Sequence, residues 1–288
     1  MKTKFLLLAL VATFGSQPST PLHATTVDAA NHYAYAANLG WVDWAGDTTN
    51  GAVIGEYGCS GYLYAANVGW INLGSGTPTN GIWYQNLSAG DFGVNQDGSG
   101  NLRGYAWGAN IGWIAFETNG APKVDLYTGN FSGSIWSANC GWISLSNAVA
   151  YVQTDTIRPG PLAPDGLPIA WLLQNFGTTN VNANADPDGD GLSNQQEYLA
   201  GTDPNDASSD LRITSITRGL AGDPTRVGLD WTANSTRAYA VQHCAALGGT
   251  NAWSDAYIDP WMGLNSITFD DSSTNAFYRI RAFRPLLR

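Results

Sequence analysis

One short phrase occurs four times in this chain before residue 145, and its centre is Ala-Asn, one variable apolar residue and then Gly-Trp. The four copies are YAANLGWVDW, YAANVGWINL, WGANIGWIAF and WSANCGWISL. Their shared tryptophans are Trp41, Trp70, Trp113 and Trp142. Such repetition constrains the fold strongly, because each copy has to form the same small structural unit. The interval between the first two tryptophans equals that between the last two, and a longer interval separates the pairs, which indicates a two-hairpin unit duplicated whole.

Within each copy, aromatic or β-branched residues alternate with small ones, as in GYAWGANIGWIAF (residues 104–116). Alternation with period two is typical of strands. The Ala-Asn-x-Gly between the two runs supplies a turn, because Asn and Gly tolerate a positive φ. A further short strand is expected upstream of each later copy, in GAVIG, FGVNQ and PKVDLY. The sequence therefore predicts a mainly β fold with a repetitive antiparallel β domain of four AN-x-GW hairpin copies. It leaves open whether these hairpins form one barrel, a solenoid or two sheets.

The repeat tryptophans allow two interpretations. Short, glycine-rich strands carry few long side chains, so the four indoles are expected to fill the core. The alternative is that they are exposed and form a platform for sugar rings. Aromatic residues outside the repeated positions, namely Trp44, Trp83 and Tyr84, are the stronger candidates for exposure.

The N-terminal segment, residues 1–24, has the features of a secretory signal peptide. Lys2 and Lys4 precede an apolar run, and cleavage is expected near Ala24. The run is too short to span a membrane. We therefore expect an exported protein, secreted or at the cell surface, without a membrane span. The formal net charge of −10 argues against nucleic acid as a partner, because phosphates require a basic surface.

The composition changes after the repeats. Residues 154–168, TDTIRPGPLAPDGLP, contain four prolines and indicate a stiff linker. A short amphipathic helix is expected next, because Pro168 suits a helix start and Gly177 a helix end. From residue 211 onward the runs LRITSI, RVGLDW, AYAVQH, SITFD and FYRIRAF predict a small β-sandwich.

The acidic residues are concentrated in one segment. Residues 159–210 carry eight acidic and no basic side chains, which favours a bound cation. Within this segment DPDGDGLSNQQE matches a 12-residue calcium loop, with Gly191 at the sharp turn. Calcium is favoured over magnesium, which demands a tighter octahedron and keeps more water. The predicted ligands are the side chains of Asp186, Asp188, Asp190, Asn194 and Glu197 and the backbone carbonyl of Leu192.

A helix is expected to leave this loop. Ser193 is placed to cap it, with Gln196 reaching back in a capping box, and Gly201 is placed to end it. Three polar residues follow in the tail. They could add a ligand, but capping of the helix is the favoured role for Asp203, Asn205 and Asp206.

The pattern D-x-D-x-D-G-x-x-N-x-x-E, then a helix and Gly-Thr-Asp-Pro, resembles the thrombospondin type 3-like, EF-hand-type calcium repeats of secreted bacterial proteins. The resemblance covers Leu167 to Asp206 and implies a structural calcium site between domains. The chain departs from a true EF-hand, because the preceding helix ends near Gly177 and no second hand follows. The AN-x-GW copies also resemble a repeat of exported bacterial proteins, with forms such as GYAWSENIGWI. The segment after residue 210 resembles the β domain that follows such calcium segments.

These observations predict five segments. They are a signal peptide (1–24), a repetitive β domain (25–153), a Pro-rich linker (154–166), a helix–calcium loop–helix segment (167–209) and a C-terminal β-sandwich domain (210–288).

The cysteines of the repeat domain occupy apolar positions. Cys140 takes the variable position of the fourth copy, and Cys59 aligns with Leu102 and Phe131. Both are therefore expected to pack as small hydrophobic residues. A disulfide between Cys59 and Cys140 is the less favoured alternative.

Few residues suggest catalysis. After the signal peptide, the histidines are His32 and His243, in different predicted domains and outside any nucleophile motif. We therefore predict that the protein is not an enzyme. A glycosidase-type carboxylate pair stays open among the turn-like acids of the repeat domain. Those acids are Asp43, Asp47, Glu56, Asp91, Asp97 and Glu117.

The sequence thus predicts an exported, non-catalytic surface or matrix protein in which calcium makes the junction between two β domains rigid. A cell-surface or extracellular polysaccharide or protein is the expected partner. One alternative is a carbohydrate-binding module that uses aromatic side chains of the repeat domain. Another is that the C-terminal sandwich is an export or anchoring signal.

Overall fold

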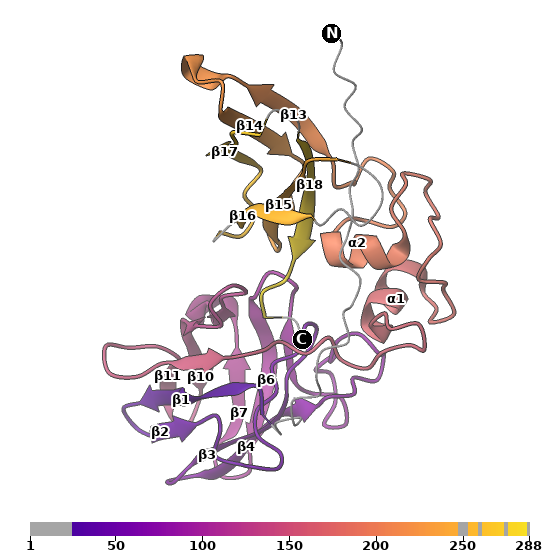
Figure 1. Cartoon of the computed structure of the whole chain (residues 1–288). Helices are drawn as coiled ribbons and strands as arrows, with labels where there is room; N and C mark the ends of the chain where they lie inside the picture. The colour runs from indigo at the N-terminus through magenta and orange to yellow at the C-terminus, as the bar shows by residue number, and fades with distance from the viewer. Residues whose placement is uncertain (1–24, 247–252, 259–260, 274–275, 287–288) are drawn as a thin grey trace. The chain divides into compact units, whose positions relative to one another are not determined.

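The computed structural model describes residues 25–246, 253–258, 261–273 and 276–286. The predicted signal peptide lies outside the described residues. The chain divides between Val181 and Asn182 into two compact units, the repeat unit up to Val181, to which Leu286 returns, and the C-terminal unit, residues 182–285. Figure 1 traces both along the chain by colour. Among the described residues, no helix is long and apolar enough to cross a membrane.

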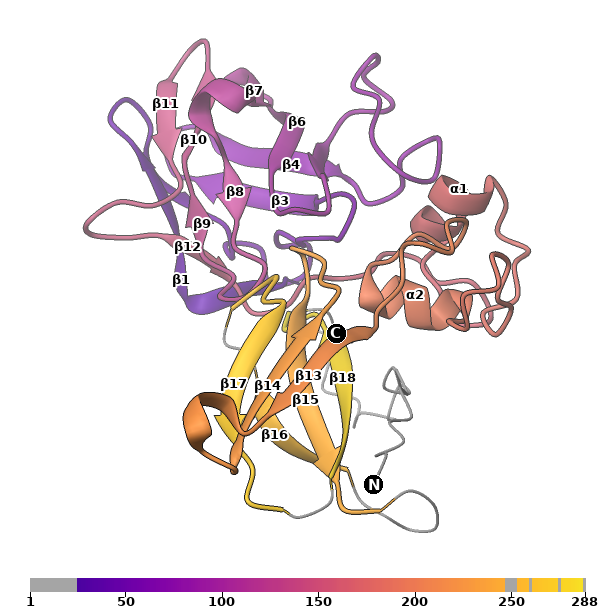
Figure 2. The ribbon, with the colours of Figure 1, turned by 90° about the horizontal axis from the view of Figure 1, so that it is seen from above.

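The repeat unit is built on eight antiparallel strands that close on themselves. Each AN-x-GW copy forms one hairpin, and the hairpins follow one another round the sheet in chain order. The strands, in hairpin pairs, are β1 (Val27–Ala36) with β2 (Gly40–Asp43), β3 (Ser60–Ala65) with β4 (Gly69–Ser75), β6 (Leu102–Gly108) with β7 (Gly112–Phe116), and β10 (Ser134–Ser137) with β11 (Gly141–Ser144). Figure 2 shows β3, β4, β6 and β7 side by side in this ring. The ring closes where β11 pairs with β1, through Ser144 opposite Tyr35.

Two short strands extend the ring, β5 (Val94–Gln96), which pairs with β6, and β12 (Val152–Thr154), which pairs with β1. A separate two-stranded sheet is formed by β8 (Lys123–Val124) and β9 (Phe131–Ser132), and η1 (Thr118–Gly120) is a 3-10 turn. The strands predicted upstream of the third and fourth copies are therefore present as β5 and β8. The run GAVIG before the second copy makes only isolated bridges, at Gly51, Val53 and Gly55.

All four junctions between hairpins use the same register. The residue two positions after each repeat tryptophan lies opposite an aromatic residue of the next hairpin. The pairs are Asp43 with Tyr64, Asn72 with Trp107, Ala115 with Trp136, and Ser144 with Tyr35. Because the closing junction repeats the pattern of the other three, the ring has an approximate fourfold repetition.

The repeat asparagine links each hairpin to the preceding one. Its Nδ2 donates a hydrogen bond to the backbone carbonyl of the variable apolar residue in the preceding copy. The bonds are Asn67 to Leu39 at 3.0 Å, Asn110 to Val68 at 2.9 Å, Asn139 to Ile111 at 3.0 Å, and Asn38 to Cys140 at 3.3 Å. The last of these runs from the first copy to the fourth, so the hydrogen bonds also form a closed circle.

The turns themselves depend on glycine alone for a positive φ. Gly40 has a φ of 81°, and the glycines of the other copies lie between 71° and 83°. Among the described residues, a positive φ outside glycine occurs only at Asn86, Ala121 and Ala221. The expectation that the repeat asparagine adopts a positive φ in the turn is therefore wrong. Its side chain forms the hydrogen bond to the preceding copy instead.

Small and aliphatic side chains fill the interior of the ring. Ala36 and Ala65, in the first two hairpins, are at most 1% exposed, and Ile71 and Ile114 are fully buried. The variable turn residue also points inward, and Leu39 is 1% exposed. A closed sheet of eight strands has an interior just wide enough for such side chains.

The four repeat tryptophans lie outside, which overturns the expectation that they form the core. Their exposed fractions are 47% for Trp41, 47% for Trp70, 45% for Trp113 and 49% for Trp142. Two of the three aromatics expected to be exposed are instead buried, Trp44 at 1% and Tyr84 at 3%, and Trp83 is half-buried. The narrow interior explains the outward position of the repeat tryptophans, because the alternate residues of these strands with smaller side chains face inward. Trp44, which directly follows β2, is not one of the repeat tryptophans and belongs to the buried core.

The cysteines are free and buried, as expected for small hydrophobic residues. Cys59 is 1% exposed and Cys140 is 7% exposed, and both belong to the core of the repeat unit. The disulfide alternative is therefore not formed. Cys244, in the C-terminal unit, is also free.

The proline-containing segment after the repeats packs on the repeat unit along its first part. Thr154 Oγ1 donates to the Thr26 carbonyl at 2.8 Å, and Arg158 N donates to the Ile54 carbonyl at 2.9 Å. The helix α1 (Ile169–Phe176) then begins after Pro168 and ends at Gly177, whose φ is positive. The division of the chain at residue 181 places α1 with the repeat unit.

The C-terminal unit contains two three-stranded antiparallel sheets. One has the order β13 (Ile213–Arg218), β14 (Arg226–Trp231), β17 (Ser266–Asp270), and the other has the order β16 (Ser254–Ile258), β15 (Ala238–Cys244), β18 (Phe277–Phe283). Leu229 from one sheet and Val241 and Ile280 from the other belong to one buried cluster. The predicted β-sandwich is confirmed, with β16 as a strand that the sequence patterns did not indicate. A short 3-10 turn, η2 (Leu220–Gly222), lies between β13 and β14.

Candidate metal centre

In the acidic loop of the C-terminal unit, backbone N–H groups donate hydrogen bonds to the aspartate side chains of the same loop. Asp186 accepts from Gly189 N at 2.8 Å and from Gly191 N at 3.0 Å. Asp188 Oδ1 accepts from Asp190 N at 3.2 Å, and Asp190 Oδ1 accepts from Leu192 N at 2.6 Å. Asp186, Asp188 and Asp190 can thereby each place one carboxylate oxygen within 4.8 Å of the others. The loop therefore gathers three of the predicted ligands around one point.

The helix α2 (Asn194–Ala200) leaves the loop as predicted. Ser193 Oγ accepts from Gln196 N at 3.4 Å, and Gln196 Oε1 accepts from Ser193 N at 2.8 Å, which completes the capping box. Gly201 ends the helix with a φ of 77°. This cap fixes the start of α2, and Asn194 and Glu197 both lie fully buried on the helix.

Four side-chain oxygens of the loop and helix are buried without a hydrogen-bond partner. They are Oδ2 of Asp188, Oδ2 of Asp190, Oδ1 of Asn194 and Oε2 of Glu197. An unsatisfied buried polar group costs about 1–3 kcal/mol, and more when it is charged. A hard divalent cation would supply the missing partner, since calcium takes six to eight oxygen ligands. The donor set is all oxygen, so the residues present fit calcium.

Neighbouring residues orient two of these groups. Asn194 Nδ2 donates to the Asn182 carbonyl at 2.9 Å, which leaves Oδ1 as the free end of the amide. Thr202 Oγ1 donates to Glu197 Oε1 at 3.4 Å, which leaves Oε2 unpartnered. When bound, calcium would neutralise the carboxylates and complete the coordination of these oxygens.

The electrostatics of the loop agree with a cation site. Burial, followed by the negative charges of Asp188 and Asp190, raises the pKa of Glu197 to about 8. Burial is also the main cause that raises the pKa of Asp190, with contributions from neighbouring aspartates. Without a cation, Glu197 therefore favours its protonated form at neutral pH.

The calcium loop packs on the sandwich through the side chain of Leu192, a residue for which the sequence predicted only a role of the backbone carbonyl as ligand. Leu192 is 4% exposed and belongs to the buried cluster of the sandwich, as does Ala200 of α2. The calcium loop, α2 and the sandwich thus share one hydrophobic core.

A second anchor was not anticipated from the sequence. Arg237, which is 2% exposed, donates from Nε to the Leu199 carbonyl at 2.7 Å and from Nη2 to the Tyr198 carbonyl at 2.8 Å. Asn234 Nδ2 donates to the Gly201 carbonyl at 2.6 Å. These bonds satisfy carbonyls that the last turn of a helix leaves without partners, and a cation is favoured there. No local pattern marked Arg237, because its partners lie far earlier in the chain, on α2.

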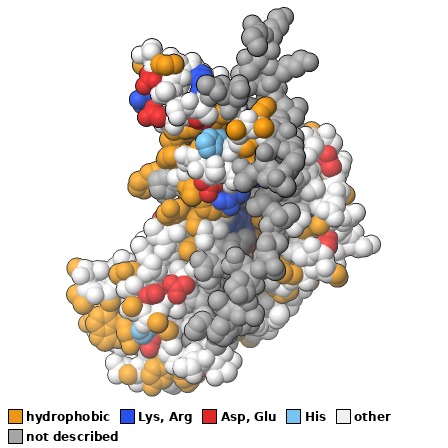
Figure 3. Space-filling view, in the orientation of Figure 1, with side chains coloured by type: hydrophobic (Ala, Val, Ile, Leu, Met, Phe, Trp, Pro, Cys, Tyr) orange, Lys and Arg blue, Asp and Glu red, His pale blue; other side chains and the backbone are white. Residues whose placement is uncertain are grey.

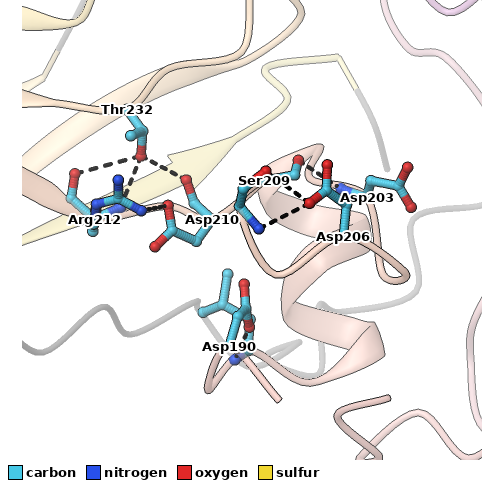
Figure 4. Close-up of polar contacts among 9 residues, drawn as sticks. Asp190, Asp203, Asp206, Ser209, Asp210, Arg212 and Thr232 are labelled. Carbon is cyan, nitrogen blue, oxygen red and sulfur yellow. Dashed lines mark hydrogen bonds and ion pairs between the residues drawn. The ribbon is translucent and has the colours of Figure 1, made fainter. Parts of the chain in front are cut away.

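The polar tail after α2 forms its own turns. Asp203 Oδ1 accepts from Asn205 N at 3.0 Å, and Asp206 Oδ1 accepts from Ser208 N at 2.9 Å. The end of α2 is closed instead by Gly201 N and Thr202 N, which donate to the Glu197 carbonyl. For Asp203 and Asp206 the favoured capping role is therefore wrong, since their side chains serve turns within the tail. Figure 4 shows Asp203 and Asp206 beside Ser209, and Asp210 paired with Arg212 near Thr232.

The histidines belong to local pairs in separate units. His32 Nδ1 lies 2.7 Å from Asp43 Oδ1, and His243 Nδ1 lies 3.2 Å from Asp271 Oδ2. Asp271 also accepts from the Tyr278 hydroxyl at 2.6 Å. Each histidine thus has a carboxylate partner within its own unit.

A capped helix, an acidic loop and a set of converging oxygens define a calcium-binding segment of the loop–helix class. Residues 186–207 match the family model of the bacterial TSP3 repeat. The match includes all six predicted ligands, and this segment is a repeat of that type. No curated protein and no solved structure matches the chain at a significant level.

Proposed function

We propose that this is an exported, non-catalytic calcium-binding protein in which the ion bound by residues 186–197 makes the connection between the two units rigid. The observation that carries the proposal is the set of four buried, unpartnered oxygens on Asp188, Asp190, Asn194 and Glu197. The TSP3 repeat is a structural calcium-binding motif, and its match covers this segment.

Contacts just before the loop support a role at the connection. Residues 178–185 join α1 to the loop. Asn194 N donates to the Ala185 carbonyl at 2.8 Å, and Gln195 N donates to the Ala183 carbonyl at 2.9 Å. An ion that holds Asn194 and Glu197 in place would therefore also hold the last residues of the connecting segment. Without the ion, the acidic side chains repel one another and this segment would loosen.

Export and the expected partner belong to the same proposal. The apolar run before Ala24 supports secretion, and the acidic balance of the chain disfavours nucleic acid. A cell-surface or extracellular polysaccharide or protein is the proposed partner of this surface or matrix protein. For extracellular calcium modules, dissociation constants of roughly 10⁻⁴–10⁻³ M are typical.

Calorimetric titration of the mature chain tests the calcium site. We expect one calcium per chain, with much weaker binding of magnesium. Asp190→Ala and Glu197→Gln should abolish the binding. Asp206→Asn is the matched control, because this nearby carboxylate serves a turn of its own and should leave binding unchanged. Equal calcium binding by both loop variants and the parent would show that the loop is not the site.

Small-angle X-ray scattering in calcium and in EDTA tests the role at the connection. We expect EDTA to broaden the distribution of distances within the parent chain. Asp190→Ala should show the broad distribution in both conditions. Calcium binding by titration with no change in scattering would leave the site in place but refute the rigid connection.

A further inference from the structure

A belt of aromatic side chains surrounds the outside of the ring. Each of the eight strands carries one outward tryptophan or tyrosine next to its AN-x-GW turn, opposite the corresponding residue of its hairpin partner. These eight residues, called the aromatic belt, are Tyr35 with Trp41, Tyr64 with Trp70, Trp107 with Trp113, and Trp136 with Trp142. The ring centroids within the four pairs are 4.9, 4.8, 4.6 and 5.1 Å apart. The belt therefore repeats one geometry four times.

The rings of the belt are open to solvent. Their exposed fractions range from 38% at Trp107 to 49% at Trp142. Figure 3 shows hydrophobic side chains gathered on the face of the repeat unit near β1 and β2. Soluble proteins rarely expose contiguous apolar patches of large extent, and those that do commonly use them for interaction. None of the belt residues belongs to the buried core cluster of the repeat unit, so core packing does not explain them.

A second row of outward side chains lies beside the belt. Each of its residues is two positions along the strand from a belt residue, on the side away from the AN-x-GW turn. It mixes aromatic rings with small polar groups. Its members are Tyr33 and Asp43, Tyr62 and Asn72, Tyr105 and Ala115, and Ser134 and Ser144. Tyr33 and Tyr62 are 37% and 38% exposed. Each hairpin thus has at least one hydrogen-bonding side chain in this row, although Ala115 stands in the third hairpin where the others have Asp43, Asn72 and Ser144.

The two rows contain no basic side chain. Their one charged residue is Asp43, which is already bound to His32 Nδ1 and to Ala45 N at 2.8 Å. An anionic polymer would be repelled by Asp43 and would have no basic side chain in the two rows to form an ion pair with. A neutral, hydroxyl-rich ligand does not need a basic side chain for binding.

We propose that the aromatic belt binds a neutral polysaccharide. A pyranose ring has C–H faces that stack on an indole and hydroxyl edges that bond to polar neighbours such as Asn72 and Ser144. A polymer of identical units matches a surface on which one geometry recurs from hairpin to hairpin, and simultaneous contacts strengthen each other. The outward curvature of a closed ring favours an extended chain, which can follow it, over a globular partner. This inference rests on the partner proposed above, which it narrows to neutral polysaccharide, and it does not depend on calcium binding.

Affinity electrophoresis of the mature chain in native gels tests the proposal. The neutral probes are hydroxyethylcellulose, mixed-linkage β-glucan and galactomannan, and the anionic probes are alginate and polygalacturonate. We expect at least one neutral polysaccharide to retard the protein and the anionic ones not to. Retardation should persist in EDTA, because the belt does not include the calcium loop.

A double variant locates the binding surface. Trp70→Ala with Trp142→Ala removes rings from the second and fourth hairpins and should weaken binding about tenfold, since aromatic anchors carry much of the energy of an interface. The matched control is Trp261→Ala, which removes a tryptophan that is 72% exposed in the C-terminal unit and should leave binding unchanged. A neutral polysaccharide should also protect tryptophans of the unmodified protein from acrylamide quenching, which is independent of how well the variant folds.

Four outcomes would overturn the proposal. They are no retardation by any neutral polysaccharide, equal retardation by the anionic ones, equal binding by the double variant and the parent, and a dimer in sedimentation velocity that the double variant abolishes. The last outcome would identify a second copy of the chain as the occupant of the belt.

Discussion

Asn38 Nδ2 donates to the backbone carbonyl of Cys140 at 3.3 Å and so joins the first AN-x-GW copy to the fourth across 102 residues of chain. The other three repeat asparagines make the same contact between hairpins that follow one another in the chain. At Asn38 it coincides with the junction where β11 meets β1. One recurrent feature of the repeat therefore both links the hairpins and closes the ring.

Loss of this closing bond should destabilise the repeat unit. A typical intramolecular hydrogen bond contributes about 1 kcal/mol, so Asn38→Ala should lower the free energy of unfolding by about that amount or less, since the bond is only partly buried. For a unit of this size, the melting temperature should fall by about 2–4 °C. Differential scanning calorimetry measures the shift. Asn180→Ala, at an exposed asparagine of the same unit outside the repeats, is the control, and equal shifts in both variants would contradict the closing role.

The outward position of the repeat tryptophans can be measured in solution. Trp142 is 49% exposed, whereas Trp44 is 1% exposed. Trp142→Phe should therefore remove acrylamide-quenchable fluorescence, and Trp44→Phe should remove fluorescence that acrylamide does not reach. If Trp142→Phe left the quenchable fraction unchanged, the indole would have to be buried.

Stability without calcium should fall as pH rises through the range in which Glu197 titrates. The pKa of Glu197 is about 8 in the folded state, against an ordinary value of 4.5. Between these values the folded protein holds a proton that the unfolded chain has released, so higher pH favours unfolding. We expect the melting temperature in EDTA to decrease from about pH 5 to about pH 9 relative to Glu197→Gln.

Calcium should reverse this trend. Protons compete with the ion for Glu197, so the rise in melting temperature on adding calcium should grow with pH over the same range. At a calcium concentration about 100 times the dissociation constant, binding stabilises by about 2.7 kcal/mol. A calcium effect that was independent of pH, or that persisted in Glu197→Gln, would exclude this carboxylate as a ligand.

Arg237 should control the stability of α2. Its guanidinium bonds to the carbonyls of Tyr198 and Leu199. Arg237→Met keeps most of the apolar stem but leaves these carbonyls unpaired, so unfolding of the C-terminal unit should become about 2 kcal/mol easier. Amide hydrogen exchange within α2 should accelerate as well. Arg226→Met, at an exposed position of β14, is the control, and unchanged exchange in Arg237→Met would refute the anchor.

Several features followed from the sequence alone, because they depend on residues close together in the chain. Ser193 and Gln196 form the capping box, Gly201 ends α2, and the acidic side chains of the loop converge, as their spacing predicted. The hairpins were likewise predictable, since alternation and a turn glycine act over a short stretch of chain. For such local features, backbone sterics and side-chain reach determine the outcome.

The tertiary structure decided everything that depends on distant residues. Period-two alternation separates two faces of a strand but does not say which face lies inside, and the narrow closed interior placed Ala36 inward and Trp41 outward. The partner of Asn38 lies in the last of the four copies, and the partners of Arg237 lie on α2, well before it in the chain. The sequence by itself thus determined the repeated hairpin and the calcium loop. Closure of the ring, exposure of the aromatic belt and the anchoring of α2 were decided only by packing, because each requires segments that meet in space and not in sequence.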